Sequence, residues 1–225
     1  MAPRASAPPI SVLVVDDHRA VAEAIRDALA GDKAFAATAA WSGEEALGIV
    51  ERDWPDVVLM DVTMPGMGGL EATRRISELA PGVKVIMLSA HDDDLVRARA
   101  IEAGALGYLS KISPMGDLVE AVRRATRGDP LVPQEEVDRL HRRLHRRRSQ
   151  DSTERQRAER LSLREIEILQ LMADGIAPPE IAARLHISQH TLRTHVQNIL
   201  TKLGVHSKVD AIVVAIRHGK VSAAT

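Results

Sequence analysis

Asp61 follows a short run of apolar residues at positions 57–60 and precedes a loop of Pro and Gly at positions 65–69. A buried strand followed by a loop and a helix would place this carboxylate at the carboxyl edge of a parallel sheet, where α/β folds hold their chemistry. Taken alone, the residue has an equally good plain explanation, because Asp is common in turns. Its role therefore depends on what the neighbouring strands carry at their ends.

Three other predicted strands also end on residues that can do chemistry: Asp16 and Asp17, Ser89, and Lys111. Each of these could singly be a helix cap, a turn residue or a surface charge, but strand ends of a parallel sheet meet at one edge and would bring them together. Three carboxylates in one place favour a hard divalent cation with oxygen ligands, and Mg²⁺ is the expected one. One carboxylate could then act as a nucleophile toward a phosphoryl group, while a Lys and a hydroxyl bind the transferred oxygens.

The elements that must position these residues alternate regularly between positions 10 and 130. Apolar runs predict strands at residues 10–15, 35–40, 57–60, 83–88 and 107–109. Each run is followed by apolar residues at helical spacing, closed in several cases by Gly. Five such units predict an α/β fold with a five-stranded parallel sheet, doubly wound, covered by helices on both faces.

Composition sets the limits of the interpretation. A chain of 225 residues favours two domains, and the aromatic content of 2% predicts aliphatic cores. The absence of Cys excludes disulfides and thiolate sites. No apolar run approaches the roughly 18 residues that span a bilayer, and residues 1–9 lack an apolar signal region and are predicted to form a disordered tail. We therefore expect a cytoplasmic protein with no membrane association.

The net charge of −1 conceals a strong division along the chain. Residues 1–138 hold 14 Lys and Arg against 23 Asp and Glu, whereas residues 139–160 hold 9 Arg against 3 acids. Residues 161–225 hold 7 basic against 5 acidic residues. This division predicts that any nucleic acid is bound by the second half.

Residues 131–160 have few apolar positions and predict a basic linker that is flexible or partly helical. Its Arg cluster could contact DNA phosphates or could simply form a solvated tether. His141 and His145 share the i, i+4 spacing of a metal pair, but no acidic partner lies near them in sequence. We do not predict a metal site here.

Residues 161–225 predict four helices that form a small all-α domain. Ser162 with Glu165 forms a capping box for the first helix, and the short link at residues 186–188 suits a helix-turn-helix. No acidic residue occurs between Ser188 and Gly204, although the chain is acidic elsewhere. The plain alternative is a polar helix face that meets only water. The outward face of the third helix offers donors and acceptors for bases and phosphates at Gln189, His190, Arg193, Thr194, Gln197, Thr201 and Lys202.

The strand-end motifs resemble a known family. Asp16-Asp17, Met-Asp-Val-Thr-Met-Pro-Gly-Met around Asp61, Leu-Ser-Ala around Ser89, and Gly-Ala-Leu-Gly-Tyr-Leu-Ser-Lys ending at Lys111 are similar to the receiver domain of two-component response regulators. The resemblance covers residues 10–130 and implies the CheY-like fold, which is flavodoxin-like.

The resemblance implies a role for each matched position. Asp61 would be the phospho-acceptor, and Mg²⁺ would bind Asp61, Asp17, Asp16 through water, and the backbone carbonyl of Thr63. The hydroxyl and aromatic switch pair would be Ser89 and Tyr108, and Lys111 would contact the phosphoryl group.

The second half resembles the LuxR-type helix-turn-helix, so that nearly the whole chain is similar to a NarL/FixJ-type response regulator. The family pattern is matched by Arg193, His195, Asn198 and Lys202. Pro178-Pro179 replace a usual polar pair, which places one phosphate contact in question, and Leu163 replaces a frequent Pro. The last helix matches the dimerisation element of the family with Ile212, Val213 and Ile216, although by themselves these residues could equally belong to the core.

The resemblance implies a transcriptional regulator and not an enzyme. A sensor histidine kinase would phosphorylate Asp61, and a homodimer would then bind double-stranded promoter DNA. Two alternatives stay open. A haloacid-type phosphatase would need a second acid two residues after the nucleophile, where Thr63 stands. A receiver could also act without phosphorylation, through a ligand or partner.

Overall fold

The computed structural model describes residues 8–90 and 93–223. Most of the predicted tail at residues 1–9 lies outside them. Asp92, which with Asp93 is predicted from the sequence to open a helix, also lies outside them. Two compact units divide the chain, Met1–Leu144 and His145–Thr225. Among the described residues, no helix combines the length and apolarity needed to cross a membrane.

The first unit contains a five-stranded sheet of order β2-β1-β3-β4-β5, in which every neighbouring pair is parallel. The strands are β1 (Ile10–Val15), β2 (Phe35–Ala40), β3 (Val57–Asp61), β4 (Lys84–Ser89) and β5 (Gly107–Ser110). All five residues of β3 are buried because the strand is central and covered on both faces. The predicted fold class is confirmed.

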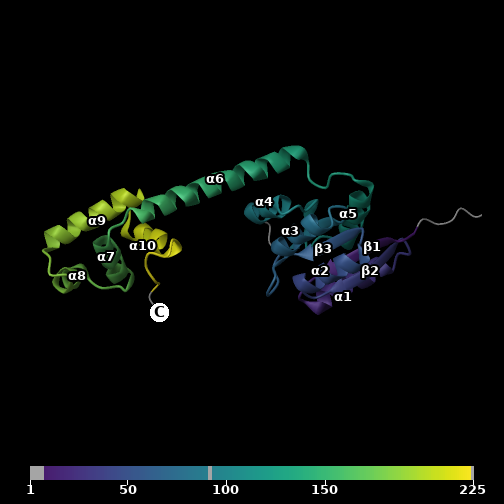
Figure 1. Ribbon diagram of the computed structural model, residues 1–225, viewed down its shortest axis with the longest axis horizontal. Coiled ribbons are helices and arrows are strands. Elements are labelled where there is room, and N and C mark those ends of the chain that lie inside the picture. The colour runs from purple at the N-terminus through teal and green to yellow at the C-terminus, as the bar shows by residue number, and fades with distance from the viewer. Residues whose placement is uncertain (1–7, 91–92, 224–225) are drawn as a thin grey trace, which may run out of the picture. The chain divides into compact units, whose positions relative to one another are not determined.

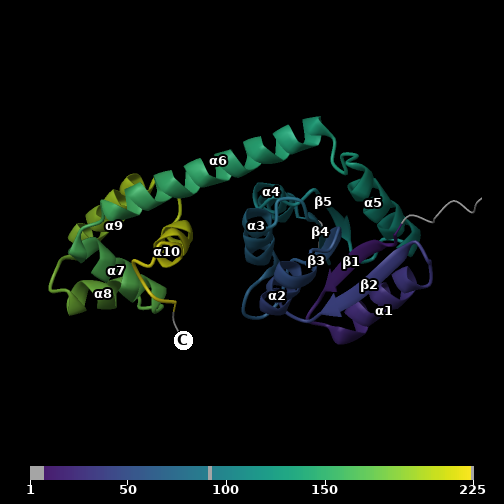
Figure 2. The same ribbon diagram turned by 45° about the vertical axis from the view of Figure 1, so that its right-hand side comes forward.

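Helices cover both faces of this sheet (Figure 1). They are α1 (Arg19–Ala30), α2 (Gly43–Asp53), α3 (Gly69–Leu79), α4 (Asp94–Glu102) and α5 (Met115–Arg127). One core cluster joins the sheet to α1 and α5, and a second joins the other face to α2, α3 and α4 (Figure 2). The two layers hold the strand ends in fixed positions at the carboxyl edge.

A single long helix, α6 (Gln134–Glu159), occupies most of the region predicted as a flexible or partly helical linker (Figure 1). Its residues 134–144 belong to the first unit and residues 145–159 to the second. Ion pairs one turn apart, such as Arg147 with Asp151 and Arg155 with Glu159, support a helix that has few apolar residues. Leu140, Leu144 and Ala158 are nevertheless buried, each within its own unit.

The second unit completes its core with four further helices: α7 (Leu163–Ala173), α8 (Pro178–Arg184), α9 (Gln189–Leu203) and α10 (Lys208–Arg217). The capping box of Ser162 and Glu165 is present, and Ser188 accepts a hydrogen bond from the amide of Thr191 at the start of α9. Gly204 ends α9 in the left-handed conformation at φ 69°. The predicted all-α second domain is confirmed.

Candidate functional site

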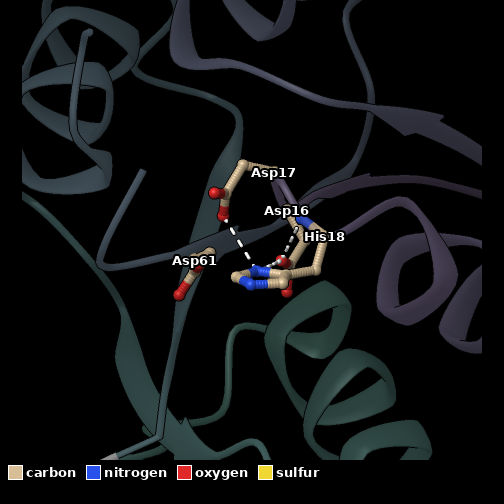
Figure 3. A group of neighbouring side chains, drawn as sticks. All are labelled: Asp16, Asp17, His18 and Asp61. Carbon is tan, nitrogen blue, oxygen red and sulfur yellow. Dashed lines mark hydrogen bonds and ion pairs between the residues drawn. The ribbon is translucent and has the colours of Figure 1, made fainter. Parts of the chain in front are cut away.

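Three carboxylates from two strand ends meet at the carboxyl edge of the sheet. Asp61 is the last residue of β3, and Asp16 follows β1 directly. Asp16 is fully buried and Asp61 is 4% exposed. Asp16, Asp17, His18 and Asp61 each offer one ligand atom, and these atoms all lie within 4.8 Å of one another (Figure 3). The predicted convergence of the acidic residues is present.

Lys111 joins two of these carboxylates from the end of β5. Its Nζ lies 2.6 Å from Oδ2 of Asp16 and 2.9 Å from Oδ2 of Asp61. The backbone amide of Lys111 donates to the carbonyl oxygen of Ser89 at 2.9 Å, which fixes the loop after β5 against the end of β4. The backbone hydrogen bond to Ser89 and the ion pairs with the two carboxylates therefore both hold the ammonium group in place.

Burial and charge act against each other in this pocket. Burial raises the pKa of Asp61, and the neighbouring Lys111 offsets only part of that effect. Burial lowers the pKa of Lys111, but its hydrogen bonds to Asp16 and Asp61 outweigh burial and leave the pKa above its usual value. One ammonium does not fully compensate the carboxylates packed around it.

The donor set fits a hard divalent cation. The Oδ1 of Asp17 is buried and accepts no hydrogen bond from any described residue. Nδ1 of His18 lies 3.2 Å from that oxygen and 3.3 Å from Oδ1 of Asp16. Such ions prefer carboxylate oxygens as ligands, and this pocket holds more carboxylates than positively charged side chains. The sequence interpretation did not include His18, although it directly follows the Asp pair.

The loop after β3 brings the start of α3 onto the backbone of Asp61. A side chain added at Gly69 would overlap the carbonyl oxygen of Asp61, so this position requires glycine. The amide of Thr63 donates to Oδ1 of Asp61 at 3.3 Å and helps orient the carboxylate. The metal role predicted for the Thr63 carbonyl stays a prediction.

Ser89 and Tyr108 border a common cavity of about 400 Å³ at the ends of β4 and β5, which α4 also lines. The phenol oxygen of Tyr108 donates a hydrogen bond to Glu136 of α6, and the guanidinium of Arg97 lies 4.4 Å from the ring centroid. Burial, together with the acceptor Glu136, raises the pKa of Tyr108 to about 12. The switch role predicted for Ser89 and Tyr108 stays a prediction, and the sequence interpretation did not include Arg97 or Glu136.

The predicted DNA-contacting residues lie along α9. Six of them are exposed, and two are half-buried, His195 and Lys202. The exposed ones are Gln189, His190, Arg193, Thr194, Gln197 and Asn198. Thr201, predicted on the same face, is also exposed.

Lys202 has a partner within its own unit. Its Nζ lies 2.7 Å from Oε2 of Glu165, whose side chain is 4% exposed. Burial raises the pKa of Glu165, but Lys202 and the amide of Ser162 outweigh it and hold the pKa below its usual value. The ammonium group thus ties α9 to the start of α7.

The predicted dimerisation residues divide into two kinds on α10. Ile212 and Ile216 are half-buried and pack against the core of the second unit. Val213 is 46% exposed, and Val209, one turn earlier, is 68% exposed. Val209 therefore joins Val213 as an exposed apolar residue that could contact a partner, although apolar spacing alone did not distinguish it from a core residue.

Both halves of the chain match known protein families. Residues 12–123 match the response regulator receiver domain, and residues 159–215 match the bacterial regulatory proteins of the luxR family. The transcriptional regulatory protein DegU of Brevibacillus brevis is 37% identical over 222 residues, covering 93% of this chain and 94% of DegU. The response regulator protein VraR of Staphylococcus aureus is 36% identical over 210 residues, covering 93% of this chain and 97% of VraR.

Solved structures agree with these matches. The response regulator ChrA, from a heme-sensing two-component system, is 32% identical with a TM-score of 0.51, covering 95% of this chain and all of ChrA. A LuxR-family response regulator from Aurantimonas is 32% identical with a TM-score of 0.53, covering 58% of this chain and 96% of that one. The chain belongs to the NarL/FixJ family of two-component response regulators, transcriptional regulators and not enzymes, in which a receiver domain precedes a LuxR-type DNA-binding domain.

Proposed function

We propose that phosphorylation of Asp61 by a sensor histidine kinase, in the presence of Mg²⁺, controls binding of this protein to double-stranded promoter DNA. The observation that carries the proposal is the meeting of Asp16, Asp17 and Asp61 with the ammonium of Lys111 at one sheet edge. We assign the receiver to residues 10–130, the linker to 131–160 and the DNA-binding domain to 161–225.

Asp61 is suited to act as the nucleophile. One of its carboxylate oxygens attacks the phosphorus of a phosphohistidine, so that a P–O bond forms and the P–N bond breaks. The leaving imidazole nitrogen keeps the bonding electron pair. Lys111, already 2.9 Å from Oδ2 of Asp61, is close enough to pair with an oxygen of the transferred group.

Asp16, Asp17 and Asp61 would hold the metal, with the carbonyl of Thr63 as a further ligand. Bound Mg²⁺ neutralises negative charge on the carboxylates and on the phosphoryl oxygens. The buried Oδ1 of Asp17, which accepts no hydrogen bond from the described residues, supports its assignment as a ligand. Ser89 would bind a phosphoryl oxygen, and Tyr108 would respond to the change.

The DNA-binding role of α9 rests on the LuxR-family match and on its exposed polar face. Arg193 is an exposed cation in the second turn of that helix, where it can reach a base edge or a phosphate. A homodimer, formed through the exposed part of α10, would place two such helices on two half-sites. Because chromosomal promoter DNA is the target, we place the protein in the cytoplasm.

Incubation with acetyl phosphate and Mg²⁺, followed by intact mass measurement, tests the phosphorylation. We expect an adduct of about 80 Da, the mass of one phosphoryl group, that Asp61→Asn abolishes and EDTA suppresses. Asp53→Asn, at an exposed Asp outside the pocket, should leave the adduct unchanged. An adduct that persists in Asp61→Asn would place the phosphoryl group on another residue and overturn the assignment of Asp61. No adduct in the natural protein would instead support a receiver that acts without phosphorylation.

DNA binding is tested separately with genomic fragments that the purified phosphorylated protein retains. Arg193→Ala should lower the affinity for these fragments at least tenfold, whereas Lys220→Gln, outside α9, should not. Binding should weaken steeply with salt because phosphate contacts release counterions. Equal affinity of the natural protein and Arg193→Ala would remove α9 from the interface.

A further inference from the structure

The first three turns of α6, residues 134–144, lie on the receiver's own α4 and β5. Leu140 is fully buried and Leu144 is 5% exposed. Both pack against buried Ala98 of α4 and against the half-buried side chains of Ile101 and Tyr108. These two leucines therefore form an apolar stripe on a mostly polar helix, and this stripe packs against α4 and β5.

Ion pairs surround this apolar contact. Arg139 and Arg143, one turn apart on α6, each place a guanidinium nitrogen 2.9 Å from Oδ2 of Asp94 at the start of α4. The hydrogen bond from Arg139 lowers the pKa of Asp94. The side chain of Asp94 is 21% exposed, so the pairs are partly shielded from water. They fix the register of α6 along α4.

The third contact involves the aromatic switch residue. Tyr108 donates its phenol proton to Glu136 of α6, and Arg97 lies over the ring with its Nη1 3.6 Å from Glu136. The same ring borders the cavity of about 400 Å³ that Ser89 also lines. The phenol group cannot bind Glu136 and turn into this cavity at the same time.

We propose that residues 134–144 form a clamp on α4 and β5 that Tyr108 holds in the unphosphorylated receiver and that phosphorylation of Asp61 releases. The inference rests on the proposed phosphorylation. When Ser89 is drawn to the phosphoryl group, Tyr108 turns toward the space at the end of β4 and gives up Glu136. Because binding free energies are reciprocal, a docked clamp must also oppose phosphorylation. The clamp is the point at which the receiver holds the helix that continues into the DNA-binding unit.

The absence of Cys from the chain provides a direct test, because a single introduced thiol reports its own exposure. Ala98→Cys places a small thiol under the clamp, and Ala100→Cys places one on the same helix against the sheet core. In the full chain treated with acetyl phosphate and Mg²⁺, we expect the thiol at position 98 to react about 5- to 150-fold faster, the range of typical allosteric coupling. The thiol at position 100 should keep its rate.

A matched pair of substitutions tests the clamp without phosphate. Glu136→Ala, in the Ala98→Cys background, removes the acceptor of Tyr108 and should speed labelling several-fold. Glu135→Ala changes the adjacent exposed residue of the same helical turn and should not. Amide hydrogen exchange of residues 134–144 in the natural protein gives the same comparison without any substitution.

The outcomes distinguish failure of the clamp from failure of the proposed phosphorylation. An adduct of about 80 Da with unchanged labelling at position 98 overturns the clamp and leaves the phosphorylation intact. A missing adduct overturns the proposed function and the phosphate-driven release together. If phosphorylation speeds thiol labelling equally at positions 98 and 100, the whole receiver loosens and the clamp is overturned. The clamp is also overturned if Glu136→Ala does not change the labelling rate at position 98.

Discussion

The ammonium of Lys111 lies 2.9 Å from the carboxylate of Asp61, and the same ammonium is 2.6 Å from Asp16. The three side chains come from the ends of β5, β3 and β1, which the parallel sheet aligns at one edge. Lys111 thus supplies a positive charge to the pocket before any metal binds. This relationship couples the stability of the receiver to its metal chemistry.

Lys111→Met should leave two buried carboxylates without their shared cation. We expect the free energy of unfolding of the first unit to fall by about 3 kcal/mol in EDTA, as when one partner of a buried pair is removed. Mg²⁺ should restore more stability in this variant than in the natural protein. Both Trp residues, Trp41 and Trp54, lie in the first unit, so their fluorescence during urea denaturation follows this unit alone.

Lys33→Met is the matched control for this experiment, because Lys33 is exposed and lies outside the pocket. Lys33→Met should change neither the urea midpoint of the first unit nor the response of that midpoint to Mg²⁺. If Mg²⁺ stabilised the Lys111 and Lys33 variants equally, the ammonium would not be compensating the carboxylates.

Asp61→Asn should change how stability depends on pH. Because the pKa of Asp61 in the folded state is raised above 3.8 by burial, its contribution is fully present below that value and is lost as pH rises through the folded pKa. Without metal, the Asn variant should therefore be more stable than the natural protein at pH 7, and the difference should shrink toward pH 4. The urea midpoints of both proteins, measured in EDTA between pH 4 and pH 7, give this difference in stability. A natural protein that gained stability relative to the variant with rising pH would contradict the raised pKa.

Gly69→Ala should destabilise the receiver, because the added methyl group would overlap the carbonyl oxygen of Asp61. We expect a loss of about 2 kcal/mol, typical of overpacking, and a slower phosphorylation of Asp61. Gly48→Ala is the matched control, since Gly48 lies inside α2 with no atom within 4 Å of the added methyl. That substitution should stabilise by about 0.5–1 kcal/mol through helix propensity. The two midpoints should move in opposite directions.

Local sequence signals were sufficient for the elements that carry the acidic site. Apolar runs ending on Asp61 and Lys111 are visible one strand at a time, and parallel topology alone brings the strand ends together. The capping signals at Ser162 and Ser188 depend only on residues within one turn. These features were predictable because their physical causes are local or follow from the fold class.

Contacts between side chains far apart in sequence were not predictable in this way. Nothing in the local pattern links Tyr108 to Glu136, or Lys202 to Glu165, since each pair depends on the packing of separate elements. Residues 131–160 look like a linker because a helix with so few apolar residues is marginal by itself. Leu140 stabilises this helix through a surface on α4 that only the folded receiver provides.

Val213→Asp should weaken DNA binding through loss of dimerisation. Val213 and Val209 expose apolar surface one turn apart on α10, and a charge placed there would be costly to bury between two copies. We expect the affinity for a DNA with two half-sites to fall tenfold or more, about 1.4 kcal/mol, while the affinity for one half-site stays the same. Fluorescence anisotropy with the two DNAs measures this difference. Leu163→Asp, at an 87% exposed apolar residue of α7, is the matched control and should change neither affinity. An equal loss on both DNAs would place Val213 in the fold or the DNA interface instead of a dimer contact.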